Sequence, residues 1–355
     1  MVTSNIKHAQ SSSLGNDRRN QLGQWVVSKL SEERGNVPEH LPLKPIVSDA
    51  SFRKYYRVMG PKGSLIAVDA PPQTEDSVTF IRIAQQWRKQ GVRVPEVHAF
   101  DLEKGFMLLE DFGDSLLHDG LLTGQEDALY AQAMALSKQL QSLPPAELPL
   151  YDENLLRFEL SLYPQWFLKS LLGLQLSSNE DQALNDVFDY LVDSALEQPM
   201  VTVHRDFHSR NLMLCDNGEL GVIDFQGALH GPILYDIVSL LKDCYHAWPR
   251  EKVERWLMDY TSDIPELGSV NPALIVKWFD WMGLQRHLKC LGIFSRLWLR
   301  DHRASYLSDL PQTLNYVIAA CKRYPELEHH GLWLEKRVLP QVSGRVQGIR
   351  EEAGV

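Results

Sequence analysis

The chain has 355 residues, which is enough for about two domains or one bilobal unit with a sizeable core. Its formal net charge is −10, and this acidity argues against a surface built to bind nucleic acid or anionic lipid. Hydrophobic residues at 44% and charged residues at 23% are ordinary for a globular protein and exclude a disordered, collagen-like or coiled-coil chain.

Cysteine usage and hydropathy predict a cytoplasmic protein that does not enter the membrane. No segment reaches the roughly 18 uncharged apolar residues of a membrane span, and the polar N-terminus lacks the apolar centre of a signal peptide. Four widely spaced cysteines form no CxxC pair or zinc pattern, so we expect reduced core thiols: Cys215, Cys244, Cys290 and Cys321.

The N-terminal part changes from helical to strand-like patterning. Residues 1–18 are polar and are expected to be a disordered tail, and apolar residues at helical spacing follow over 22–30. Segments 46–47, 52–58 and 65–68 are rich in β-branched and aromatic residues and are separated by turn residues. They predict three successive antiparallel strands.

A helix over 78–87 and two more strands over 97–100 and 106–110 complete a β-β-β-α-β-β order. The chain beyond is mainly helical. We therefore predict an α+β fold with two lobes, a small antiparallel-sheet lobe and a larger helical lobe. The expected bounds are an N-terminal nucleotide-binding lobe over 19–113, a C-terminal catalytic and acceptor-binding lobe over 114–340, and a tail over 341–355.

The helical part is interrupted at 201–224 by a strand, a polar loop and a hairpin. The loop contains His204, Asp206 and Asn211, and the hairpin turns at Asp216-Asn217-Gly218, a strong short-turn signal. This hairpin is expected to bring Asp224 back beside Asn211.

Phosphoryl transfer needs these residue types. One carboxylate accepts or orients the proton of the attacking hydroxyl, while an amide oxygen and a second carboxylate hold Mg²⁺ at the phosphates. Asp206 is the candidate base, and Asn211 and Asp224 are the candidate metal ligands. The spacing His-x-Asp-x4-Asn, followed by Asp-Phe, resembles the catalytic core of the protein-kinase-like superfamily. The resemblance implies a protein-kinase-like bilobal fold, ATP and Mg²⁺ as cofactors, and a structural role for His204 in the catalytic loop.

Only eleven residues separate Asp224 from Asp236, which leaves no room for a peptide-docking activation segment. An Asp that opens an apolar helix at this place is similar to the aminoglycoside phosphotransferase family of small-molecule kinases. That resemblance implies that Asp236 braces the catalytic loop, and a helix N-terminal carboxylate is stabilising in any case. No P-loop pattern is present.

Three further blocks resemble the kinases of peptidoglycan recycling that phosphorylate the anomeric hydroxyl of N-acetylmuramate and N-acetylglucosamine. The blocks are residues 48–58, 67–72 and 281–289, and the resemblance covers roughly residues 20 to 340. It implies a small amino sugar as the binding partner. No obligatory protein partner is evident from the sequence.

The phosphate side departs from the superfamily pattern, because Asp69 stands where relatives place a strand lysine. We expect Arg53 or Arg57 to supply part of that positive charge, with Asp69 anchoring one of them. Ser48 and Ser51 replace the usual glycines of the phosphate-covering turn. A solvated basic strand face remains an equal alternative for the arginines.

The resemblance also places adenine against the backbone of the segment joining the lobes, at Glu110 and Phe112. Candidate acceptor contacts lie in the helical lobe, where aromatic rings could stack on sugar faces and charged groups could meet hydroxyls or a carboxylate. These candidates are Glu159, Trp166, Trp281 and Arg286, the last with Lys289. A core position for the tryptophans and a solvated basic face for Arg286 and Lys289 are the more ordinary interpretations.

Two alternatives remain open. The acceptor could be an aminoglycoside, choline or another small alcohol on the same fold. The missing strand lysine also permits a nucleotide-binding pseudokinase that acts as a regulator, although Asp206, Asn211 and Asp224 are all present.

Overall fold

The computed structural model describes residues 17–32, 38–46, 52–145 and 147–353, and the chain forms two compact units. Unit 1 comprises Met1–Leu117 together with Leu212–Gln226, and unit 2 comprises His118–Asn211 together with Gly227–Val355. The expected boundary at 113/114 lies close to the end of the first segment of unit 1. The segment Leu212–Gln226, which contains the predicted hairpin, was expected in the larger C-terminal lobe but belongs to unit 1.

Unit 1 contains one five-stranded antiparallel sheet, so the predicted β-β-β-α-β-β order is confirmed. Its strand order is β1-β2-β3-β5-β4. The elements are β1 (Lys44–Ile46), β2 (Lys54–Gly60), β3 (Gly63–Asp69), α2 (Ser77–Lys89), β4 (Val97–Asp101) and β5 (Phe106–Glu110).

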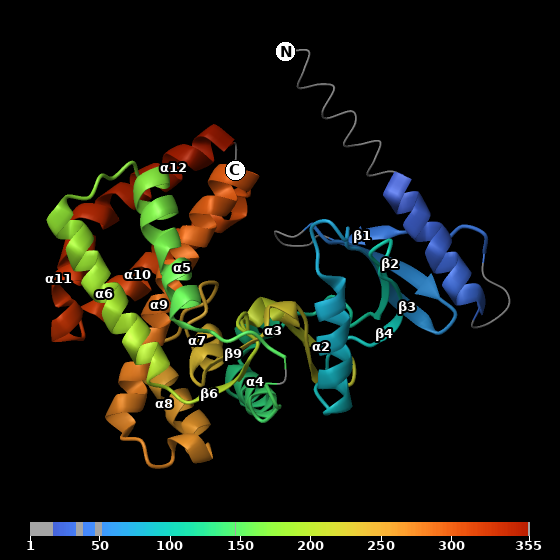
Figure 1. Cartoon of the computed structure of the whole chain (residues 1–355), viewed down its shortest axis with the longest axis horizontal. Helices are drawn as coiled ribbons and strands as arrows, with labels where there is room; N and C mark the ends of the chain where they lie inside the picture. Colours follow the sequence, from blue (N-terminus) through green and yellow to red (C-terminus); the bar gives the residue numbers. More distant parts are fainter. Residues whose placement is uncertain (1–16, 33–37, 47–51, 146, 354–355) are drawn as a thin grey trace. The chain divides into compact units, whose positions relative to one another are not determined.

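The strand alternation sends one set of side chains toward the helix over 17–32. Residues directly opposite in an antiparallel pair share a face, and Tyr56 pairs with Ala67 while Lys54 pairs with Asp69. Tyr56 and Ala67 belong to a core cluster with Leu22 and Trp25 of that helix. Figure 1 shows this helix and α2 on either side of the strands.

The hairpin of unit 1 joins β7 (Leu212–Leu214) to β8 (Leu220–Val222), and its first pair is Leu212 with Val222. The predicted hairpin is therefore confirmed. Gly218 takes a φ of 79° in the turn, a left-handed conformation that glycine adopts without steric cost.

Unit 2 is mainly helical, as expected. Short strands β6 (Met200–Val203) and β9 (Leu229–Pro232) form an antiparallel pair. The longer helices are α4 (Glu126–Gln141), α5 (Glu153–Leu162), α6 (Ser178–Leu196), α7 (Tyr235–Leu241), α8 (Arg250–Thr261), α9 (Pro272–Asp301), α10 (Leu310–Cys321), α11 (Pro325–Trp333) and α12 (Leu339–Ala353). Shorter elements are 3₁₀ turns at Leu121–Thr123, Ser209–Asn211, Pro265–Leu267 and Ala304–Asp309, and π-helical segments at Tyr163–Leu171 and Leu334–Val338. Helix α3 (Leu117–Gly120) and the 3₁₀ turn at Phe225–Gly227 lie where the chain passes between the two units.

Helix α9 is the central element of unit 2, and α5, α6, α7 and α10 all pack against it (Figure 1). Helix α9 approaches the end of α5 so closely that only glycine fits at position 292. A Cβ there would lie 2.4 Å from the carbonyl carbon of Leu162. Gln285, Arg286 and Lys289 of α9 are buried in unit 2.

The C-terminal segment differs from the expected tail, because residues 341–353 continue α12. Val342, Val346 and Ile349 are buried. Their spacing of four and three residues places them on one helical face, so a short apolar stripe holds the segment against the unit. At the other end, residues 17 and 18 already belong to the first helix, and residues 1–16 lie outside the described part.

The four cysteines are free and buried, as predicted. Throughout the described ranges, no helix combines the length and the apolar character needed to cross a membrane.

Candidate functional site

The loop that contains the predicted catalytic residue Asp206 runs from the end of β6 to the 3₁₀ turn at Asn211 in unit 2, and buried Asp236 holds its beginning. Asp236 accepts hydrogen bonds from the backbone N–H groups of His204 (2.7 Å) and Arg205 (2.9 Å). Arg205 has a φ of 76°, a conformation that is strained for a side chain with a Cβ. The two bonds from Asp236 stabilise this bend, which precedes Asp206 directly.

A second buried carboxylate holds the end of the loop. Asp243 accepts from the backbone N–H of Ser209 (3.0 Å) and from its hydroxyl (2.6 Å). Asn211 donates its side-chain N–H to the backbone oxygen of Asp206 (2.9 Å). Because the amide nitrogen is used in this way, the amide oxygen of Asn211 is the atom oriented to accept or to ligate.

Asp206 is half-buried and carries a negative charge under ordinary conditions. Burial alone would raise the pKa of its carboxyl. Lys289, His208 and Arg286 outweigh that effect and hold the pKa well below its usual range. The carboxylate is therefore available to orient a hydroxyl and to accept its proton.

The cations beside Asp206 are held in turn by Glu159, which is 1% exposed. Lys289 Nζ lies 3.0 Å from Glu159 Oε1, and Arg205 forms a second ion pair with the same carboxylate. Burial would raise the pKa of Glu159, but Lys289 and Arg205 reverse the effect and lower it. Tyr151 and Gln285 also donate to this carboxylate. A charge buried this deeply is tolerated because every neighbour is an opposite charge or a donor.

The remaining acceptor candidates differ in their surroundings. Arg286 is 4% exposed, and its Nη1 lies 3.9 Å from Cys244 Sγ and 3.7 Å from Cys290 Sγ. Trp281 is buried between Tyr190 and Tyr324, whose ring centroids lie 6.1 and 5.8 Å away, so it is a core residue.

Trp166 is half-buried on the π-helical segment. Among the sequence-predicted residues, Asn211 therefore bonds to Asp206 directly, and the charges of Lys289 and Arg286 act on its carboxylate. Glu159 is linked to Asp206 only through its ion pair with Lys289.

In unit 1, Asp224 follows the hairpin and has a φ of 64°, again a left-handed conformation in a residue with a Cβ. Gln226 donates to Asp224 Oδ1 (2.7 Å). The ring of Phe225 packs against α2, with centroids 4.7 Å from Phe80 and 5.8 Å from Trp87. The sharp backbone turn at Asp224 is therefore fixed by packing on one side and by strand pairing on the other.

The predicted link between Asp69 and Arg53 or Arg57 is wrong. Asp69 shares a sheet face with Lys54 and Ala67, and this face is covered by the helix over 17–32. Arg18 of that helix donates to Asp69 Oδ1 (3.0 Å). Arg53 and Arg57 alternate onto the opposite face, so Asp69 does not anchor them.

Arg53 and Arg57 each have partners of their own within unit 1. Arg53 is 2% exposed and pairs with Glu75 (3.2 Å) at the start of α2. Arg57 donates to Asp111 Oδ2 (2.6 Å) and Asp114 Oδ2 (2.7 Å), so it braces the segment after β5. Ser48 and Ser51 lie outside the described residues.

The two residues predicted to contact adenine lie at the end of β5 and directly after it. Glu110 accepts two hydrogen bonds from Arg93, and its backbone N–H donates to the carbonyl of Glu96 (2.9 Å). Phe112 is buried, and its ring packs against the hairpin at Met213 and Cys215.

Sequence reasoning missed Arg18, Arg93, Arg205 and Asp243. Arg205 stands inside the recognisable catalytic motif, so its position was a usable signal. The others lie in segments without a motif, and only the fold shows their partners.

The fold and the site define a small-molecule kinase-like phosphotransferase. A solved structure of similar fold is Plasmodium vivax ethanolamine kinase, which is 13% identical with a TM-score of 0.59, over 84% of this chain and 86% of that one. The sequence profile of the phosphotransferase enzyme family (APH) matches residues 42–269, and the chain belongs to this family.

Two relatives are similar over nearly their whole length. An N-acetylmuramate/N-acetylglucosamine kinase of Pseudomonas aeruginosa is 42% identical, over 91% of this chain and 97% of the relative. A protein of the same name from Pseudomonas putida is 40% identical, over 88% of this chain and 95% of the relative.

Proposed function

We propose that this protein is an ATP- and Mg²⁺-dependent kinase that phosphorylates the anomeric C1 hydroxyl of N-acetylmuramate and N-acetylglucosamine in peptidoglycan recycling. The observation that carries the proposal is the 42% identity to a kinase of that name over 91% of this chain. The ionised Asp206 in a doubly braced loop supplies a group suited to the reaction.

In the proposed reaction, the C1 oxygen forms a bond to the γ-phosphorus of ATP while the bond to the bridging oxygen breaks, releasing ADP. Asp206 orients the hydroxyl and takes its proton, which then passes to solvent. Glu159 holds Lys289 and Arg205 near Asp206 through its two ion pairs. We assign Glu159 to positioning, because its 1% exposure leaves no surface for a sugar.

Asn211 and Asp224 are proposed to hold Mg²⁺. Both offer hard oxygen atoms of the kind that this ion prefers, and the amide nitrogen of Asn211 is already used as a donor. When bound, the ion neutralises charge on the phosphates. Within the described residues no cluster of three or more His, Cys, Asp or Glu side chains could hold a metal alone. We propose that phosphate oxygens of the nucleotide would supply further ligands.

The nucleotide is proposed to bind through unit 1. Adenine would meet the backbone at Glu110 and Phe112, and the serines at 48 and 51 would contribute to the phosphate side. Arg53 and Arg57 would add positive charge there without direct contact, because both are engaged in ion pairs. The ion pairs of Arg57 with Asp111 and Asp114 support a role in holding the adenine-binding segment. A cytoplasmic location accords with four buried free thiols.

Acceptor contacts are proposed at Trp166 and Arg286, with Trp281 supporting them from the core. Arg286 is a buried cation whose hydrogen bonds go to two thiols. Its cost of burial would be offset by an anionic group near Asp206, such as a transferred phosphoryl group or the carboxylate of a muramic sugar.

The test is an ATP-consumption assay with Mg²⁺ on N-acetylmuramate, N-acetylglucosamine, choline and kanamycin, with Asp206→Asn as the control. Turnover of the two amino sugars that is lost in the variant supports the proposal. Turnover of choline or kanamycin alone would show that the acceptor is not an amino sugar of this kind. Nucleotide binding without turnover of any acceptor would favour the pseudokinase.

A further inference from the structure

The hairpin that carries Asp224 is tied to the adenine-binding segment by Arg93, which lies between α2 and β4. Arg93 Nη1 donates to Glu110 Oε2 (2.7 Å) and Nη2 donates to Oε1 (2.5 Å), a two-bond pair at the end of β5. Its guanidinium also lies over the ring of Phe112, 4.4 Å from the centroid. One side chain therefore holds two residues of the proposed adenine-binding segment.

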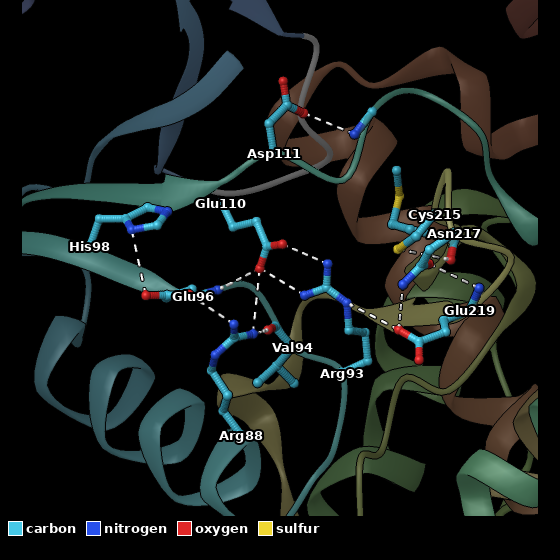
Figure 2. A network of polar contacts seen from close by, with 12 residues as sticks. Arg88, Arg93, Val94, Glu96, His98, Glu110, Asp111, Cys215, Asn217 and Glu219 are labelled. Carbon is cyan, nitrogen blue, oxygen red and sulfur yellow. Dashed lines mark hydrogen bonds and ion pairs between the residues drawn. The ribbon is translucent and has the colours of Figure 1, made fainter. Parts of the chain in front are cut away.

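The same arginine holds the hairpin. Its backbone oxygen accepts from the N–H of Val222 (2.8 Å), two residues before Asp224. Its Nε lies 3.7 Å from Glu219 Oε2. Asn217 turns this carboxylate toward Arg93 by donating to Oε2 (2.7 Å), and Figure 2 shows Arg93 pointing between Glu110 and Glu219.

Packing reinforces the connection between the two segments. The ring of Phe112 occupies the space beside Gly221, where a Cβ would lie 2.4 Å from its Cε2 atom. Asp224 stands between this contact and the packing of Phe225 on Phe80. The position of Asp224 in unit 1 is thus set from both sides.

We infer that Arg93 is a positioning residue that couples the adenine-binding segment to the metal-binding carboxylate. Through Arg93, residues Glu110–Phe112 and Asp224 form one rigid frame within unit 1, so that the nucleotide base and its metal ligand are placed together. The inference rests on the proposed function, which assigns adenine to the first group and Mg²⁺ to the second.

A lysine cannot replace Arg93, because the contacts use the planar, forked shape of the guanidinium and its flat face. Arg88 provides a matched control. It donates to Glu96 (2.8 Å) and Glu110 (3.5 Å) in the same network, but these partners lie in the loop before β4 and at the end of β5, and not on the hairpin.

The experiment measures binding of an ATP analogue that cannot transfer phosphate, with and without Mg²⁺, to full-length wild type, Arg93→Met, Arg93→Lys and Arg88→Met. Altered support of a metal ligand typically weakens metal affinity, and we expect both Arg93 variants to need about tenfold more Mg²⁺ for half-maximal binding. Arg88→Met should stay within about twofold of wild type, because it leaves the hairpin contacts intact.

Folding is checked by thermal unfolding of each variant. Glu219→Gln serves as a second hairpin-side variant, because Glu219 is largely exposed and its loss should not unfold the chain. It should shift the Mg²⁺ requirement in the same direction by a smaller factor. Equal Mg²⁺ requirements in Arg93→Lys, Glu219→Gln and Arg88→Met would overturn the inference alone. A wild type that binds the analogue equally with and without Mg²⁺ would overturn the proposed function as well.

Discussion

Around Asp206, single side chains set the charge on which the proposed chemistry depends. Lys289 contributes most to lowering the pKa of Asp206, and Glu159 holds Lys289 in place through a 3.0 Å contact. This arrangement keeps the carboxylate ionised in mildly acidic solution. Substituting Lys289, which takes no part in the proposed proton transfer, should therefore change the pH dependence of turnover.

Lys289→Met should move the acidic limb of the kcat profile to higher pH. Removing the cation raises the pKa of Asp206 toward its ordinary value, so the ionised form is lost at a higher pH. The profile is measured from about pH 3 to 8, so that it includes the ordinary range of an Asp carboxyl. Lys277→Met is the control, because Lys277 lies on the same helix over the ring of Trp281. An unmoved limb in the Lys289 variant would contradict this account of Asp206.

Asp236 gives a second prediction, on stability. Burial raises its pKa from 3.8 to about 7 despite the two backbone hydrogen bonds. The folded protein therefore keeps a proton that the unfolded chain releases, and the stabilisation from this group is lost as pH rises from about 4 to 7. Asp236→Asn does not titrate. Urea unfolding at about pH 4.5 and 8 should show the wild type losing stability relative to the variant, and a constant difference would contradict the prediction.

The individual residues that the sequence predicted are those of a motif with characteristic spacing. Asp206, Asn211, Asp224 and Asp236 follow from the pattern, and their assigned roles remain predictions. The partner of Asp69 could not be predicted, because it depends on which sheet face the helix over 17–32 covers. Burial of Glu159 was likewise invisible, since its partners come from residues 205, 285 and 289.

Among the elements, one close contact within each unit leaves room only for glycine. Gly292 of α9 faces the backbone of Leu162 at the junction of α5 and the π-helical segment. Gly221 of β8 faces the ring of Phe112. Gly292 meets helix backbone, whereas Gly221 meets a side chain of the segment proposed to bind adenine. Substitution of Gly292 should therefore affect stability, and substitution of Gly221 should affect nucleotide binding.

Gly292→Ala should destabilise the protein by about 1–3 kcal/mol, because the added Cβ meets backbone that cannot move aside without shifting a helix. Gly348→Ala in α12 is the matched control, since no atom lies within 4 Å of its added Cβ. Alanine should be neutral or stabilising there by up to about 1 kcal/mol. Equal unfolding midpoints for the two variants in urea would contradict the packing of α9.

Gly221→Ala should raise the KM for ATP more than it changes kcat at saturating ATP. The Cβ displaces Phe112, and with it the segment proposed to bind adenine. The readout is a steady-state titration of ATP against a saturating sugar. A loss of kcat with an unchanged KM would contradict the placement of adenine there.

The strands of unit 1 and the hairpin were predictable from alternation and turn residues. The π-helical segment at Tyr163–Leu171 was not, because its apolar residues fit an ordinary helix equally well. The end of α12 was missed because its stripe of Val342, Val346 and Ile349 spans only about two turns.

For the whole molecule, the division into two units cuts through the catalytic motif itself. Asp206 and Asn211 belong to unit 2, whereas Asp224 belongs to unit 1. Chain order alone predicted a single break near residue 113. The hairpin contacts Arg93, Phe112 and Ser115 of unit 1, residues that lie far earlier in the chain, so its place in unit 1 could not be predicted from chain order.

The measurement that tests the central claim most directly is phosphorus NMR of the product formed from ATP, Mg²⁺ and N-acetylmuramate, repeated with N-acetylglucosamine. The account predicts a phosphate signal coupled to the anomeric proton for both sugars. Asp206→Asn should lose that signal, with a rate reduced by at least about 100-fold at unchanged thermal stability. A phosphate on any other hydroxyl, or full activity in the variant, would contradict the account.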